Sequence, residues 1–104
     1  MSRILVDLNP ATGPKDAPVN RPRVTDTQSG RVLLDLWDTW EWDAYVVRND
    51  GGLVTLRLRS YPGTVEGGLT IDADAGTYAI RPRHRWWAFR AVRQRLRAAG
   101  LKRS

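Results

Sequence analysis

The chain has 104 residues, which is the length of one small domain, and its formal net charge of +6 conceals an uneven distribution. Residues 1–80 hold 8 basic side chains against 11 acidic ones, whereas residues 81–104 hold 9 basic side chains and no acidic one. The chain has no Cys and a single His, which excludes disulfides, thiolate metal sites and His-rich metal sites, and we expect no cofactor.

The apolar run near the start of the chain is short and is interrupted by Asp7, so it does not resemble the core of a signal peptide. The sequence also lacks a run of about 18 apolar residues, the minimum for a membrane-spanning helix. We therefore expect a protein that is not secreted by a signal peptide and that does not cross a membrane.

The first predicted region, residues 1–30, consists of a short strand at residues 4–8 and an extended arm at residues 9–30. Four prolines occur in the arm at a spacing of four: Pro10, Pro14, Pro18 and Pro22. Proline fixes φ and lacks a backbone N–H, so this spacing argues against a helix or an interior strand. We expect the arm to be disordered or to lie across a neighbouring subunit.

The second predicted region, residues 31–82, is a small antiparallel β-sandwich or barrel, because apolar and polar residues alternate along it. One apolar face consists of even-numbered residues: Val32, Leu34, Leu36, Trp40, Trp42, Ala44 and Val46. The polar break at residues 38–39 divides this face, which predicts a hairpin or a bent pair of strands. Turn signals at residues 49–52, 62–63 and 72–76 separate further short strands, as is typical of this fold class.

The third predicted region, residues 83–100, is an amphipathic basic helix, and a tail follows at residues 101–104. Its apolar residues follow helical spacing: Trp86, Phe89, Val92, Leu96 and Ala99. Gly100 is a natural end for the helix, and Lys102 and Arg103 are expected to complement the negative charge of the helix C-terminus. The sequence therefore predicts a mainly β protein with a Pro-rich arm and a C-terminal helix.

Candidate catalytic groups are few. His84 lies among arginines that favour its neutral form, and its expected role is that of a surface histidine at the start of the helix. Asp72 and Asp74 flank a turn, but the later Gly and Glu of a calcium-binding loop are missing. We assign no catalytic, cofactor-binding or metal-binding residue and expect a protein that is not an enzyme.

Four carboxylates form an acidic strip along the predicted strands: Asp35, Asp38, Glu41 and Asp43. Alternation places most of this strip opposite Trp40 and Trp42, so we expect the strip to face solvent or a partner and the two tryptophans to lie in the core. Trp37 is out of phase, and it is a candidate exposed aromatic, such as a platform for a sugar, unless a bulge at Asp38 turns it inward. Trp87, at the boundary of the helix, is a second candidate.

Five arginines of the helix region are candidates for binding a partner: Arg83, Arg85, Arg90, Arg93 and Arg97. On nucleic acid, their guanidinium groups would contact phosphates. A membrane is disfavoured as a partner because the apolar side of the helix is short. On a protein, the arginines would meet an acidic strip, and between subunits that pairing makes a head-to-tail interface. The helix thus has three possible acceptors, namely its own strip, the strip of a neighbour and nucleic acid.

Four segments carry a recurring pattern: RVLLDLW at residues 31–37, WDAYVVR at 42–48, LVTLRL at 53–58 and EGGLTIDADAGTYAI at 66–80. This pattern resembles small β-sandwich domains of tailed-phage proteins, such as those at the start of upper baseplate and fibre-attachment proteins. The resemblance covers about half of the chain and ends where the Arg-rich helix begins. It implies no active site, and it carries over no functional residue.

The resemblance and the residue patterns together favour a non-enzymatic structural or adaptor protein of a phage-like particle, in the tail, neck or baseplate. Such a protein would reside in the virion or in the host cytoplasm, and its arm, acidic strip and helix would bind copies of itself or other particle subunits. Two alternatives stay open. The first is a nucleic-acid-binding accessory or regulatory protein that uses the helix, and the second is a phage-encoded inhibitor of a host protein.

Overall fold

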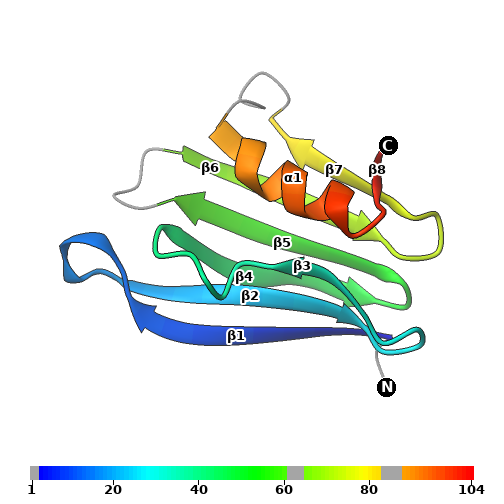
Figure 1. Ribbon diagram of the computed structural model, residues 1–104, viewed down its shortest axis with the longest axis horizontal. Helices are drawn as coiled ribbons and strands as arrows, with labels where there is room; N and C mark the ends of the chain where they lie inside the picture. Colours follow the sequence, from blue (N-terminus) through cyan, green and yellow to red (C-terminus); the bar gives the residue numbers. More distant parts are fainter. Residues whose placement is uncertain (1–2, 61–64, 83–87) are drawn as a thin grey trace.

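A computed structural model describes residues 3–60, 65–82 and 88–104, and this part of the chain is mainly β, as predicted (Figure 1). A three-stranded sheet contains β1 (Ile4–Thr12), β2 (Pro18–Asp26) and β3 (Arg31–Asp35) in that order. A five-stranded sheet contains β4 (Trp42–Asp50), β5 (Leu53–Ser60), β6 (Val65–Asp72), β7 (Thr77–Arg81) and β8 (Lys102–Arg103). The helices are the short 3-10 helix η1 (Pro14–Asp16) and the predicted C-terminal helix, α1 (Arg90–Ala98).

The segment expected to be an extended arm is a β-hairpin instead. β1 and β2 pair antiparallel from Ile4 opposite Asp26 to Thr12 opposite Pro18, and β2 is the central strand of its sheet. The prolines are accommodated by position, because Pro18 is the first residue of β2 and Pro10 lies on the edge strand β1. Four prolines at intervals of four residues therefore did not exclude a hairpin.

Pro22 shows why an interior strand tolerates a proline at this point. Its carbonyl faces β3 and accepts a hydrogen bond from the Leu36 N–H at 2.9 Å, beyond the last residue pair between β2 and β3. The N–H and C=O of one strand residue point to the same side, so the donor that Pro22 lacks would also face β3. The ladder between β1 and β2 loses no hydrogen bond.

Of the two arrangements expected for residues 31–46, a hairpin or a bent pair of strands, the hairpin does not form. β3 pairs with β2 while β4 pairs with β5, so residues 36–41 carry the chain from one sheet to the other. The expected even-numbered face is interrupted too, because Leu33 is buried and Val32 is 45% exposed. The β2–β3 register shifts between Val24 and Thr25, which accounts for the change of face.

In the five-stranded sheet, the predicted turns at residues 49–52 and 72–76 are present, and the one predicted at residues 62–63 lies outside the described residues. The register of β4 shifts between Val46 and Arg48. Beyond the start of this edge strand the apolar side chains are exposed: Tyr45, Val46 and Val47. Val46 was expected to continue the buried face. It pairs with Leu56 in register with Ala44 opposite Leu58, so it keeps that face, but it is 39% exposed at this edge of the sheet.

The predicted C-terminal helix is present, and the tail that follows it differs from its prediction. α1 begins at Arg90, and residues 83–87, where we expected its first turn, lie outside the described residues. Gly100, with a φ of +90°, follows the helix as predicted. Lys102 and Arg103, however, form β8, which pairs parallel with β7 instead of capping the helix.

The hydrophobic core lies between the two sheets and α1, which runs beside β3 (Figure 1). The Phe89 and Trp42 rings stack with their centroids 5.4 Å apart, and this contact fixes the start of α1 to the five-stranded sheet. Gly67 makes room for it, since a Cβ there would lie 2.7 Å from the Phe89 ring. These residues join α1 to the core: Phe89, Val92, Leu96 and Leu101.

Candidate functional site

Residues 36–41, the connection between β3 and β4, present two tryptophans on the surface and are held in place by hydrogen bonds. The N–H and hydroxyl of Thr39 both donate to the Leu36 carbonyl, at 3.1 and 2.7 Å. The Trp37 N–H donates to the Asp35 carboxylate at 2.9 Å, and Arg21 donates to the Trp37 carbonyl. The connection is therefore ordered before any partner binds, so binding would cost little backbone conformational entropy.

Trp37, a predicted exposed aromatic, is half-buried. The guanidinium carbon of Arg23 lies 3.5 Å from the centroid of its ring, and its indole N–H donates to the Asp7 carbonyl at 3.2 Å. Arg23 in turn pairs with Asp35 at 3.1 Å. One face of the ring is thus occupied within the chain, which leaves Trp37 less suited to stack on a ligand than its sequence position suggested.

Trp40, which we expected in the core, is 62% exposed and is the most exposed of the large apolar side chains in the described residues. The expectation failed because Trp40 precedes β4, so the alternation of a strand does not apply to it. Trp42, the first residue of β4, is buried as expected. The Arg21 guanidinium lies 5.9 Å from the Trp40 ring centroid, and the rest of the indole is open to solvent.

The acidic strip is exposed or half-exposed, and each carboxylate accepts a hydrogen bond within the chain. Asp35 is bound by Arg23 and Asp38 by Arg95. Asp43 accepts the Asn20 backbone N–H at 2.7 Å, and Glu41 accepts the Trp40 backbone N–H at 3.2 Å. Two carboxylates of the strip are therefore neutralised by arginines, and two accept backbone donors.

Arg95 joins α1 to the acidic strip of its own chain. Its guanidinium donates to both carboxylate oxygens of Asp38, at 2.5 and 3.2 Å, and to the Asp35 carbonyl at 2.6 Å. These hydrogen bonds to Arg95 lower the pKa of Asp38, and the same contacts raise the pKa of Arg95. The helix thus docks on its own strip, although through a residue that the sequence reasoning did not select.

The arginines that the sequence did select lie elsewhere. Arg90 and Arg97 are exposed on α1, and Arg93 is half-buried. Arg83 and Arg85, together with Trp87, lie outside the described residues. In the described part of the chain, no hydrogen bond or ion pair joins Arg90 or Arg97 to the strip, so both remain available to a partner.

A shallow, open groove of about 300 Å³ separates β3 from α1. It is lined by Val32, Leu33, Leu34, Asp35, Arg95, Ala98 and Ala99. Arg95 crosses it to Asp35, and Arg31 reaches from β3 to the Ala99 carbonyl at the end of the helix. The groove is therefore bridged at two points by side chains of the protein itself.

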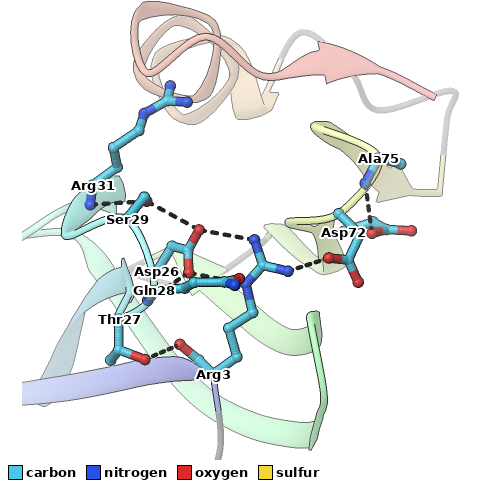
Figure 2. A network of polar contacts seen from close by, with 9 residues as sticks. Arg3, Asp26, Thr27, Gln28, Ser29, Arg31, Asp72 and Ala75 are labelled. Atoms are coloured by element: carbon cyan, nitrogen blue, oxygen red, sulfur yellow. Dashed lines mark hydrogen bonds and ion pairs between the residues drawn. The ribbon is translucent and has the colours of Figure 1, made fainter.

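A second polar network joins Arg3, just before β1, to the β2–β3 turn and the β6–β7 turn (Figure 2). Arg3 binds both carboxylate oxygens of Asp26, at 3.0 and 3.1 Å, and also binds Asp74. Asp26 is 5% exposed, and its hydrogen bonds to Arg3 and then to Gln28 and Ser29 lower its pKa from 3.8 to about 2. This network fixes the start of β1 to the β2–β3 and β6–β7 turns.

In residues 3–60, 65–82 and 88–104, no group of three or more His, Cys, Asp or Glu side chains is arranged to hold a metal ion. Nor does any helix of this described part have the length and apolar composition that crossing a membrane requires. No family model, no curated protein and no solved structure matches the chain.

Proposed function

We propose that the protein is a non-enzymatic structural or adaptor subunit of a phage-like particle, of the tail, neck or baseplate, and that it binds neighbouring subunits through the surface around Trp40. The observation that carries this proposal is an indole that is 62% exposed on a connection fastened by hydrogen bonds. Exposing such a side chain in water has a cost that a binding partner removes.

The surroundings of Trp40 have the character of a binding hot spot. Trp and Arg are the side chains that contribute most to protein interfaces, and here Trp40 lies beside Arg21. Hydrogen bonds already fix the backbone of residues 36–41, so a partner gains the contact without first ordering the loop. The same surface contains Trp37 stacked on Arg23, which extends the aromatic and cationic area.

A particle subunit should be found in the particle. We expect the protein to co-purify with particles from its native source on a density gradient. We also expect the tagged protein to bind the dissociated subunits of those particles, and Trp40→Ala to weaken that binding by about 2 kcal/mol or more. Val47→Ala is the control, because Val47 is 59% exposed on the edge of β4, outside the connection.

Two results would contradict this proposal. The first is a protein that is absent from purified particles and binds none of their subunits. The second is binding that Trp40→Ala and Val47→Ala reduce equally, because the contact would then lie outside the surface around Trp40.

A nucleic-acid-binding accessory role is the second candidate, and the exposure of Arg90 and Arg97 favours it. Binding to duplex or single-stranded nucleic acid should then fall steeply as salt is raised, and Arg90→Glu with Arg97→Glu should abolish it. Retention that does not depend on salt would reject this role.

A further inference from the structure

Two surfaces of different character lie at opposite ends of the long axis of the molecule, which measures 38 Å (Figure 1). At one end, residues 36–41 lie against the β1–β2 turn, where a Cβ on Gly13 would be 2.9 Å from the Trp40 carbonyl oxygen. At the other end, β8 lies beside the β6–β7 turn, and the Lys102 N–H donates to the Gly76 carbonyl at 2.9 Å.

The second of these surfaces is positive, and we name it the cationic end: Arg97, Lys102 and Arg103. All three side chains are exposed, and none makes a hydrogen bond or ion pair with another described residue. Of the carboxylates of the β6–β7 turn, Asp74 binds Arg3, and Asp72 accepts the backbone N–H of Ala75. No acidic residue follows Asp74 in the sequence. In the described residues, therefore, no carboxylate forms an ion pair with the cationic end.

The first surface supplies such a counter-charge, and we name it the acceptor end: Trp40, Glu41 and Asp43. In the described part of the chain, Glu41 and Asp43 accept hydrogen bonds from backbone N–H groups only, so no cation pairs with either carboxylate. Trp40, next to Glu41 in the chain, is 62% exposed, and Arg is the cation that most often stacks on Trp.

We propose that the cationic end of one copy docks on the acceptor end of the next copy. Arg97 or Arg103 would stack on the exposed indole of Trp40, and the other basic side chains would pair with Glu41 and Asp43. β8, which carries Lys102 and Arg103, and residues 36–41 lie toward opposite ends of the long axis, so these two basic residues would reach Trp40 of another copy (Figure 1). The contact joins unlike surfaces and is a heterologous, head-to-tail interface, which builds rings or filaments.

This inference rests on the proposed function, because it names the partner that binds the surface around Trp40. The cis contacts support the chemistry. Arg21 already lies over the Trp40 ring, and Arg95 already pairs with Asp38 of the same strip. Arginine from the next copy would use the remaining indole surface and the two carboxylates that no arginine binds.

Sedimentation velocity of the purified chain tests the proposal with two variants that each lose one end. The acceptor variant carries Trp40→Ala and Glu41→Lys, and the donor variant carries Arg97→Glu and Arg103→Glu. A control variant, Arg48→Glu with Arg90→Glu, makes the same change in net charge as the donor variant, at other exposed sites. Circular dichroism checks that each variant keeps its β-rich fold.

The wild type and the control should sediment faster as concentration rises, and each end variant alone should remain a monomer. An equal mixture of the two end variants should form a heterodimer that grows no further, because each partner retains one competent end. High salt should weaken all of these complexes.

A wild type that stays monomeric at every concentration overturns the head-to-tail contact, and so does a mixture that forms no heterodimer while the wild type self-associates. The proposed function is judged separately, by binding of particle subunits through Trp40. If the protein is monomeric but still binds those subunits, only the inference about the second copy is wrong. If it binds neither itself nor those subunits, both proposals are wrong.

Discussion

Trp40 and Trp42 are two residues apart in the sequence and lie in opposite environments. Trp42 is 3% exposed and stacks on Phe89 in the core, whereas Trp40 is 62% exposed on a connection between the sheets. Residues two apart share a face only where both belong to one strand, and β4 begins at Trp42. One tryptophan therefore stabilises the fold, and the other is left for a partner.

The largest expected effect separates these two residues directly. Trp42→Ala removes a buried ring and its stack on Phe89, so we expect the free energy of unfolding to fall by about 3–5 kcal/mol. Trp40→Ala removes an exposed ring, and we expect a change within about 0.5 kcal/mol. Urea denaturation of the two variants measures both values, and losses of equal size would show that the environments had been assigned incorrectly.

Gly67 and Gly68 offer a matched pair of substitutions that tests the packing of Phe89 on β6. Gly67→Ala would place a Cβ 2.7 Å from the Phe89 ring and 2.8 Å from the Arg81 carbonyl oxygen, so we expect a loss of about 1–3 kcal/mol. A Cβ on Gly68 meets nothing within 4 Å, so Gly68→Ala should change stability by less than about 0.5 kcal/mol. Thermal unfolding compares the two, and similar midpoints would contradict the packing of Phe89 on β6.

The buried carboxylate of Asp26 predicts how stability depends on pH. Its pKa in the folded chain is about 2, below its ordinary value of 3.8, so the ionised form stabilises the fold. That contribution is fully present above about pH 4 and is lost as pH falls towards 2. Asp26→Asn should flatten this part of the acid-denaturation profile, while Asp50→Asn, at an exposed carboxylate, should leave it steep. A wild-type profile that is flat over this range would refute the role of the Arg3–Asp26 pair.

The smallest expected effect concerns the bridge between Arg95 and Asp38. Both side chains are partly exposed, at 36% and 71%, so a double-mutant cycle with Arg95→Gln and Asp38→Asn should give a coupling of about 0.2–1 kcal/mol. High salt should reduce the coupling. A coupling of zero in low salt would mean that the Arg95–Asp38 bridge does not help to hold α1 on the acidic strip.

Much of the fold followed from local patterns in the sequence. The β-rich class, the turns at residues 49–52 and 72–76, the C-terminal helix and its end at Gly100 all depend on residues close together in the chain. The hairpin of β1 and β2 did not follow, because whether a proline is tolerated depends on which side of a strand its missing donor faces. Local composition does not contain that information.

The site was predicted only in part for a similar reason. The acidic strip and Trp37 were selected from the sequence. Trp40 was assigned to the core because the apolar alternation of residues 32–36 was extended past the break at residues 38–39. Arg95 was missed because helical spacing grouped Arg90, Arg93 and Arg97 and did not show which side of α1 meets β3. Placing Arg95 requires the packing of helix against sheet, which is a tertiary feature.

The central claim is that Trp40, and not the core tryptophan two residues away, meets a partner. It is tested most directly by NMR spectra of the indole N–H groups in the ¹⁵N-labelled protein, recorded as the concentration of the protein itself, or of dissociated particle subunits, is raised. We expect the Trp40 signal to shift or broaden while the Trp42 signal stays in place. A Trp40 signal that is unchanged at every concentration, or one that moves no more than that of Trp42, would contradict the account.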